Sequence, residues 1–270
     1  MKAVQSFFQN GHMLREINRT NIVLVPKVKK PEEVSQFRPI SCCNFVYKVI
    51  SKVMVSRIKP MMEGLITQNQ CAFVERRQIQ DNILIANKAF HHMKLKKQGK
   101  RYEMAVKVDM NKAYDMVEWD FLMAVMEKMG FEGKWMEWIS ECISSVSYNI
   151  IVNGKHSRTI FPSRGIRQGD PLSPYLFLFV IDVLSRMINK AIESRSLIGI
   201  KLGKDCPVLS HLLFADDSLF FLSANKESGI AMKCILQKYC EGSGQKVNLS
   251  KLSIIFSNNV PEQIKADIAR

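Results

Sequence analysis

The stretch HLLFADDSLFFL, residues 211–222, decides how this chain folds. Apolar residues flank the four residues Ala215-Asp216-Asp217-Ser218, and this pattern predicts two short strands joined by an acidic turn. Two adjacent carboxylates repel each other beside apolar flanks unless a positive charge lies between them. Asp also favours ordinary hairpin turns, so the pair alone does not establish a metal site.

A third aspartate ends another apolar stretch. Residues 104–109 read MAVKVD, which predicts a buried strand that closes on Asp109. Asp109, Asp216 and Asp217 together would offer the oxygen ligands that Mg²⁺ prefers. Two such ions can activate an attacking hydroxyl and stabilise a leaving pyrophosphate. The sequence does not prove that Asp109 meets the pair, because 107 residues separate it from Asp216.

Helical and strand patterns alternate along the rest of the chain and predict an α+β fold with a helix-backed sheet. Strands are predicted at 21–26, at 252–256 and in a hairpin over 148–161 around Asn153-Gly154. Helices are predicted at 44–63, 80–95, 118–129, around 135–143, 174–193 and 227–240. Gly242 and Gly244 are expected to end the last of these helices.

Composition narrows the class of protein. The 270 residues are 47% hydrophobic, enough for a substantial core. The 39 Lys and Arg outnumber the 25 Asp and Glu, a net charge of +14 that favours a polyanionic partner, although many soluble proteins are basic without one. Seven cysteines without a C-x-x-C pair indicate neither a disulfide framework nor a zinc finger. No signal peptide is expected, because the N-terminus has no apolar h-region. No membrane span is expected either, since the longest apolar run, 175–181, is far too short to cross a bilayer.

Six motifs occur in a fixed order. They are LVPK (24–27), FRPIS (37–41), KVDMNKAYDMVEW (107–119), RGIRQGDPLSPYLF (164–177), HLLFADD (211–217) and SGQKVNLSK (243–251). Together they closely resemble the reverse transcriptase of non-LTR retrotransposons, the long interspersed elements, in the form common in plant genomes. The resemblance covers residues 7–257.

The resemblance implies a right-hand polymerase fold with fingers over 1–100, a palm over 101–270 and the thumb missing. It implies an RNA-directed DNA polymerase that adds deoxynucleotides to a primer 3′-hydroxyl with two Mg²⁺ ions, or Mn²⁺ in their place. RNA template, DNA primer and deoxynucleoside triphosphates are the implied partners, with no membrane. Endonuclease and thumb regions would lie in a longer polyprotein. The family's life cycle implies cytoplasmic synthesis and nuclear action, but the sequence fixes no compartment.

The resemblance also assigns roles to single residues. Asp109, Asp216 and Asp217 resemble the metal-binding triad. Lys27 and Arg38 resemble the fingers residues that bind the triphosphate. Tyr114 resembles the steric gate that selects the sugar, and Gln168 and Gly169 resemble the residues that pack against the nucleotide. Lys251 resembles the lysine that protonates the leaving pyrophosphate. Most of these residues have a structural alternative. Lys27 could be a solvated lysine, Arg38 a structural residue before Pro39, Tyr114 a core aromatic and Gln168 a turn residue. For Lys251 the alternative is Lys246, which could occupy the same position of the family motif.

Two departures from the family pattern and two competing functions stay open. Met116 follows KAYD where the family usually has Arg, and Asp182 stands where a Glu is common. One alternative function is an inactive retrotransposon relic that only binds nucleic acid. The other is a related palm such as a group II intron maturase, which the motif wording disfavours.

Overall fold

The structure is a computed structural model that describes residues 2–269 of the 270. The described chain divides into two compact units, and each unit is built from two separate stretches of sequence. Residues 2–61 and 114–179 form the first unit, and residues 62–113 and 180–269 form the second. The naming of 1–100 as fingers and 101–270 as palm stays a prediction.

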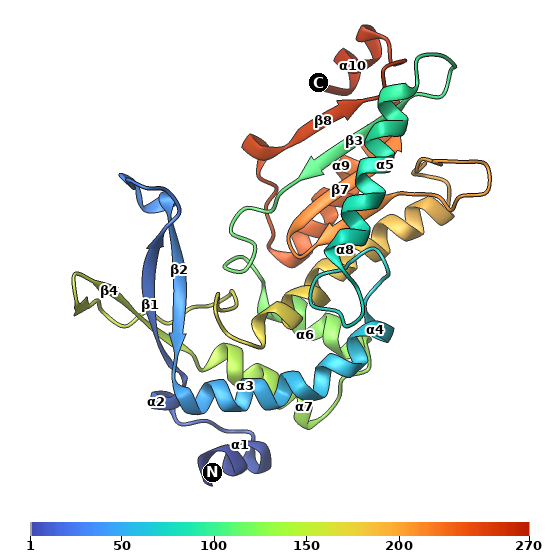
Figure 1. Cartoon of the computed structure of the whole chain (residues 1–270). Coiled ribbons are helices and arrows are strands. Elements are labelled where there is room, and N and C mark those ends of the chain that lie inside the picture. Colours follow the sequence, from blue (N-terminus) through green and yellow to red (C-terminus); the bar gives the residue numbers. More distant parts are fainter. Residues whose placement is uncertain (1, 270) are drawn as a thin grey trace. The chain divides into compact units, whose positions relative to one another are not determined.

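The first unit contains a four-stranded sheet with the order β2-β1-β4-β5 (Figure 1). Strand β1 pairs antiparallel with β2 and parallel with β4, so strands from both stretches of this unit share one sheet. Its elements are α1 (Lys2–Asn10), α2 (Arg15–Asn18), β1 (Arg19–Pro26), η1 (Val34–Gln36), β2 (Phe37–Cys43), α3 (Phe45–Ile58), η2 (Lys59–Met61), α6 (Trp119–Lys128), α7 (Lys134–Ser144), β4 (Ser147–Val152), β5 (Lys155–His156) and the start of α8 (Ser173–Glu193).

Strand β2 lies where the sequence predicted no strand. Pro39 has no N–H to donate, and such residues are confined to sheet edges. The structure resolves the conflict because β2 is an edge strand, with Pro39 opposite Leu24 of β1. The first stretch of the chain is therefore a mixture of strands and helices.

The second unit contains an antiparallel sheet with the order β6-β7-β3-β8. Helix α5 packs on one face of it, where Ala89 and Met93 join a core with Ala105, Leu212 and Phe221, and Figure 1 shows α9 behind the sheet. The helix-backed sheet of the predicted α+β fold is confirmed, and all its strand pairs are antiparallel. The elements are α4 (Met62–Leu65), α5 (Ile79–Leu95), β3 (Glu103–Val108), the rest of α8, β6 (His211–Phe214), β7 (Asp217–Ser223), α9 (Lys226–Ser243), η3 (Leu249–Lys251), β8 (Ser253–Phe256) and α10 (Glu262–Ala269).

Two predicted helix boundaries were wrong. The helix expected over 44–63 begins after the N-cap Asn44 but breaks at the 3-10 turn η2, which contains Pro60, before α4. Gly242 lies inside α9, and Gly244 alone ends that helix with a left-handed φ of 75°. Other predicted helices and strands agree with the structure to within a few residues.

Two simpler expectations can be compared with the described residues. All seven cysteines carry free thiols. Within residues 2–269, no helix combines the length and the apolar character that crossing a bilayer requires.

Candidate active site

Sheet register brings the three aspartates to the same end of the second unit's sheet. Strands β3 and β7 run antiparallel, and Val108 lies opposite Ser218. Asp109 is the next residue along the chain after Val108, and Asp217 immediately precedes Ser218. Asp109 and Asp217 therefore lie at the same end of the β3–β7 ladder, where Asp217 also pairs with Phe214 of β6, and Asp216 lies in the adjoining turn.

The turn that carries Asp216 is held by a residue that the sequence did not reveal. Ala215 has a φ of 52°, a region that costs a residue with a side chain roughly 1–2 kcal/mol. Gln70 is fully buried, and its amide bonds both backbone groups of Ala215: the Ala215 N–H donates to Gln70 Oε1 at 3.0 Å, and Gln70 Nε2 donates to the Ala215 carbonyl at 3.3 Å. This clamp stabilises the strained turn and fixes where Asp216 projects.

Lys251 reaches the same edge through backbone pairing just beyond β3. Met110 forms a bridge with Val247, and the Asn248 N–H donates to the Asp109 carbonyl at 2.8 Å. The next turn of chain places Lys251 Nζ 3.0 Å from Asp109 Oδ2. Its side chain is 62% exposed, while that of Asp109 is 18% exposed, so the lysine covers the carboxylate from the solvent side.

Electrostatics at this edge favour an added positive charge. The pKa of Asp216 is raised by burial first, and then by the negative charges of Asp217 and Asp109, while Lys251 opposes the rise. A cation beside these carboxylates would stabilise the ionised form of Asp216. Lys251 supplies part of that charge in this structure.

The donor set fits a divalent cation in chemistry and charge, because hard carboxylate oxygens suit Mg²⁺. As the side chains stand, however, no group of three or more His, Cys, Asp or Glu within residues 2–269 is arranged to hold a metal ion. Asp109 is instead paired with Lys251. Metal binding by the triad therefore requires Asp109 to exchange this ion pair for the metal.

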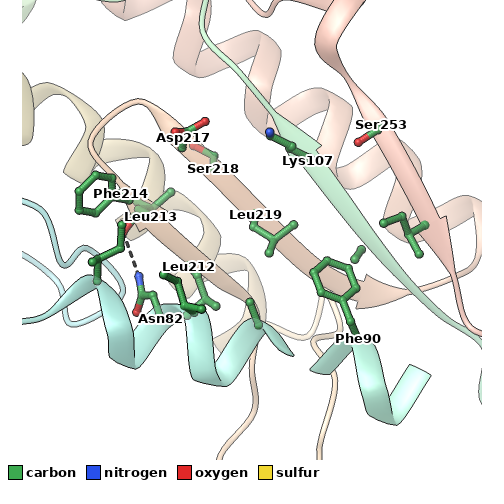
Figure 2. A pocket seen from close by; sticks show the side chains of 15 residues that line it. Asn82, Phe90, Lys107, Leu212, Leu213, Phe214, Asp217, Ser218, Leu219 and Ser253 are labelled. Carbon is green, nitrogen blue, oxygen red and sulfur yellow. Dashed lines mark hydrogen bonds between the residues drawn. The ribbon is translucent and has the colours of Figure 1, made fainter. Parts of the chain in front are cut away.

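A pocket of about 380 Å³ lies beside Asp217, between α5 and the sheet. Figure 2 shows Lys107, Asp217 and Ser253 along one side of it, with Phe90 and Leu212 across from them. The lining is mostly apolar. Asp217 thus adjoins a mostly apolar surface.

Lys27 and Arg38 belong to the first unit and are both exposed. Arg38 lies opposite Val25 in the β1–β2 ladder. Lys27 directly follows the end of β1, and its N–H donates to the Gln36 carbonyl at 2.8 Å. Lys27 Nζ donates to the Ser35 carbonyl at 2.9 Å. The β1–β2 hairpin thus carries an exposed lysine and an exposed arginine, side chains of the types that bind phosphate oxygens.

The RQGD loop holds Gln168 and Gly169 against β2 of the same unit. The Ser41 N–H donates to the Gln168 carbonyl at 2.7 Å. Gly169 has a φ of 104°, and a Cβ there would lie 3.1 Å from the Ser41 carbonyl oxygen, so a larger residue would be strained. Gln168 is half-buried, and its carbonyl is fixed by this contact.

Tyr114 is fixed on both its backbone and its ring. The Ile166 N–H donates to the Tyr114 carbonyl at 2.9 Å. The ring stacks on Phe177, with centroids 5.1 Å apart and planes 14° from parallel. The nearby Gly165 has no room for a side chain, since a Cβ would lie 2.8 Å from the Asp115 carbonyl oxygen.

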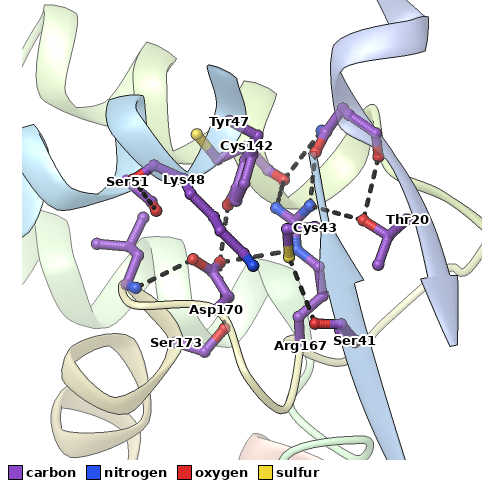
Figure 3. Close-up of polar contacts among 12 residues, drawn as sticks. Thr20, Ser41, Cys43, Tyr47, Lys48, Ser51, Cys142, Arg167, Asp170 and Ser173 are labelled. Atoms are coloured by element: carbon purple, nitrogen blue, oxygen red, sulfur yellow. Dashed lines mark hydrogen bonds and ion pairs between the residues drawn. The ribbon is translucent and has the colours of Figure 1, made fainter. Parts of the chain in front are cut away.

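A buried polar network holds the RQGD loop in place (Figure 3). Arg167 donates to Asn18 Oδ1 at 2.6 Å and to the Cys142 carbonyl at 2.8 Å, and its guanidinium carbon lies 3.8 Å from the Tyr47 ring centroid. The Tyr47 hydroxyl donates to Asp170 Oδ2 at 2.7 Å, and burial raises the pKa of this hydroxyl. The sequence analysis did not predict this network. Its one local sign was the pair of opposite charges formed by Arg167 and Asp170.

The structure thus brings the predicted residues into two sets. The second unit holds Asp109, Asp216, Asp217 and Lys251, and the first unit holds Lys27, Arg38, Tyr114, Gln168 and Gly169. The roles assigned to these residues stay predictions.

Comparison with known proteins identifies relatives along most of the chain. The Drosophila melanogaster Pol polyprotein from type-2 retrotransposable element R2DM is 24% identical over 94% of this chain and 23% of its own length. The Xenopus laevis transposon TX1 uncharacterized 149 kDa protein is 23% identical over 94% of this chain and 19% of its own length. This chain therefore spans about a fifth of either relative.

A shorter relative and a solved structure add to this. The uncharacterized mitochondrial protein AtMg01250 of Arabidopsis thaliana is 50% identical over 68 residues, 25% of this chain and 56% of its own. The apo telomerase of Candida tropicalis, truncated from its C-terminal domain, superposes with a TM-score of 0.59 at 16% identity, over 89% of this chain and 50% of that one. That likeness shows the α+β polymerase fold. A profile of the reverse transcriptase (RNA-dependent DNA polymerase) family matches residues 26–265, and the chain belongs to this family.

Proposed function

We propose that this chain is the polymerase core of a plant-type non-LTR retrotransposon reverse transcriptase, which adds deoxynucleotides to a primer 3′-hydroxyl on an RNA template. The observation that carries the proposal is the β3–β7 register, which takes Asp109 and Asp217 to one sheet edge beside Asp216. The Arabidopsis thaliana relative, 50% identical over 68 residues, supports the plant type.

Asp109, Asp216 and Asp217 are the residues proposed to hold two divalent ions, Mg²⁺ or Mn²⁺. When bound, these ions would supply the charge that activates the primer hydroxyl and stabilises the pyrophosphate. Lys251 is released from Asp109 in that state and becomes the proton donor for the leaving group. Its 62% exposure leaves the side chain free to make that change.

The first unit's residues are proposed to bind the nucleotide. Lys27 and Arg38 hold the triphosphate as a point charge and a bidentate fork. Tyr114, fixed by its stack on Phe177, excludes a 2′-hydroxyl and so selects deoxynucleotides. Gln168 and Gly169 pack against the base and sugar. In this proposal, residues 1–100 act as fingers and 101–270 as palm.

A longer protein is part of the proposal, because the chain spans about a fifth of its retrotransposon relatives. Endonuclease and thumb regions would be supplied there. A relic that binds nucleic acid without turnover is the second candidate. The ion pair between Lys251 and Asp109, which occupies one of the three carboxylates, is the observation that favours it.

Primer extension on poly(rA)/oligo(dT) with Mg²⁺ separates the two candidates. The wild-type chain should extend the primer, and Asp216→Ala should reduce extension by on the order of 100-fold or more, as loss of a preorganised charged group does. Asp205→Ala, at an exposed loop position, is the matched control and should keep wild-type activity. Far-UV circular dichroism of each variant verifies folding.

Absence of any wild-type signal, with all variants folded, would leave the binding-only relic. Extension that survives Asp216→Ala would show that the activity does not depend on these carboxylates and would remove the proposed catalytic centre.

A further inference from the structure

A second pocket lies at the opposite end of the same sheet from the aspartates. It measures about 920 Å³, near the upper end of the roughly 300–1,000 Å³ typical of ligand sites. Its lining includes Glu103, at the start of β3, whereas Asp109 follows the end of that strand. At about 3.3 Å per residue, the pocket lies roughly 20 Å from Asp109. It is therefore separate from the candidate active site.

Basic side chains from separate segments line this pocket. They come from the end of α5, the segment after it, the end of α8 and the segment after that: Lys96, Lys100, Arg101, Arg195 and Lys201. Glu103 is the one acidic residue of the lining. Within this concave surface, five basic residues thus stand against one acidic residue.

The acid is already neutralised within the pocket wall. Glu103 is buried, with Lys96 bonded to one carboxylate oxygen and His92 Nε2 3.2 Å from the other. Among the described residues, no acidic partner lies within ion-pair distance of Lys100, Arg101 or the other two basic residues of the lining. These four exposed cations are therefore free to bind an anion.

The pocket wall is built by backbone hydrogen bonds. The Ser223 N–H donates to the Ile198 carbonyl at 2.8 Å, and the Ala224 N–H donates to the Tyr102 carbonyl at 2.9 Å. Tyr102 also lines the pocket and is half-buried. A ring beside arginine and lysine side chains is the combination that binds single-stranded nucleic acid through stacking and phosphate contacts.

A simpler explanation is that the basic residues stabilise helix C-termini, where cations interact favourably with the helix dipole. It applies to Lys96 and Arg195, which follow α5 and α8. It does not apply to Lys100, Arg101 and Lys201, which lie more than one helical turn past the ends of α5 and α8. These three residues are the ones that a test has to change.

We propose that this pocket is a second RNA-binding site, which holds the phosphodiester backbone of a single-stranded RNA about 20 Å from the aspartates. The proposal of this second site rests on the proposed function only for the identification of the bound nucleic acid as RNA. A strand held there raises the effective concentration of template at the catalytic edge.

Fluorescence anisotropy with a labelled oligo(rU) of about 20 nucleotides tests the site. The affinity is measured at several salt concentrations, because contacts to phosphates make it depend on salt. The variant Lys100→Gln/Arg101→Gln/Lys201→Gln removes three pocket charges. Lys226→Gln/Lys233→Gln/Lys238→Gln removes three exposed charges of α9 and is the matched control. The pocket variant should bind roughly tenfold or more weakly, with the salt slope reduced by about 2, and the control should change far less.

Equal effects of the two variants, or unchanged affinity in the pocket variant with its fold intact, would overturn the proposal. The binding assay needs no polymerisation, so an inactive polymerase would leave it readable. Conversely, extension of a short annealed primer–template by the pocket variant at saturating concentration should match wild type, since the pocket is remote from the aspartates.

Discussion

His211 shows how the strand before the acidic turn handles a polar side chain in the core. It is fully buried, with Nε2 2.7 Å from Ser185 Oγ and Nδ1 2.9 Å from Ser210 Oγ. Both ring nitrogens thus have neutral partners, and burial lowers the pKa of His211 to about 4. The imidazole is neutral at pH 7 and acts as a structural residue of β6.

This pKa predicts acid sensitivity. Between pH 6.5 and 4 the unfolded chain binds a proton at His211 that the folded chain does not, so the free energy of unfolding falls as pH falls. The expected loss between pH 7 and pH 5 is about 2 kcal/mol. His211→Gln removes the titration while keeping hydrogen-bonding groups, and urea unfolding at both pH values should show a correspondingly smaller loss.

His156→Gln is the matched control, because His156 is exposed, and it should keep the wild-type loss. Asp216 contributes a slope of opposite sign, since its pKa is raised, but that slope is common to all three proteins. An identical pH dependence in wild type and His211→Gln would contradict the assignment of a neutral core histidine.

The candidate residues that the sequence revealed and those it did not differ in where their partners lie. Asp109 and Asp216 could be located because each stands at the end of an apolar run, a local pattern. Gln70 gave no such pattern, because its partner Ala215 is 145 residues away. Arg167 contacts Asn18 across 149 residues. Only the folded chain shows which buried polar groups satisfy each other.

The loop between β5 and α8 contains glycines with unusual backbone conformations and is held by buried charged residues. Gly165 and Gly169 give it backbone conformations that other residues avoid, at φ of 90° and 104°. Arg167 and Asp170 between and beside them are buried and tied to Tyr47. The loop therefore holds Gln168 on a fixed base, which the proposed contact with a nucleotide would require.

Removing the arginine should destabilise the protein strongly. Arg167→Met leaves the Asp170 carboxylate buried without its cation and the Asn18 and Cys142 oxygens without their donor, and breaking a buried pair in this way costs about 3 kcal/mol or more. Arg164→Met breaks the exposed pair with Glu118 and should cost no more than about 1 kcal/mol. Chemical denaturation of both variants measures the difference.

Arg167→Met/Asp170→Asn should recover part of the lost stability, because the uncompensated charge is removed with its partner. If the single variants Arg167→Met and Arg164→Met lost equal stability, the network would not be the foundation of the loop.

Elements with strong periodicity were predictable, and those whose form depends on neighbours were not. Helix α8 has a continuous apolar character and was placed within a residue of its observed bounds. Strand β2 was missed because Pro39 and its polar neighbours suit a loop, and the strand exists only through its ladder with β1. The break at η2 was missed because the apolar pattern continues past Pro60.

The chain as a whole interleaves its two compact units. Residues 62–113 of the second unit lie between the two stretches of the first, and residues 114–179 of the first unit lie between the two stretches of the second. No single cut of the backbone therefore separates the two units. Strand β1 has its parallel partner β4 more than 120 residues later, with Arg19 opposite Ser147. Sequence alone could not show this, because parallel pairing between distant strands leaves no local pattern.

Interleaving predicts how the chain responds to division. The fragments 1–100 and 101–270 meet in an exposed segment, yet β1 would lose β4, and Cys71 N–H would lose the Leu213 carbonyl that it contacts at 3.2 Å. Neither fragment alone should show a cooperative thermal transition by circular dichroism, and mixing them should restore one. A full chain cut by a protease site placed at residues 97–100 after folding is the control and should stay folded, since the cut backbone is exposed. A cooperative transition in isolated 1–100 would show that β1, β2 and α3 form a self-sufficient core, contrary to the pairing of β1 with β4.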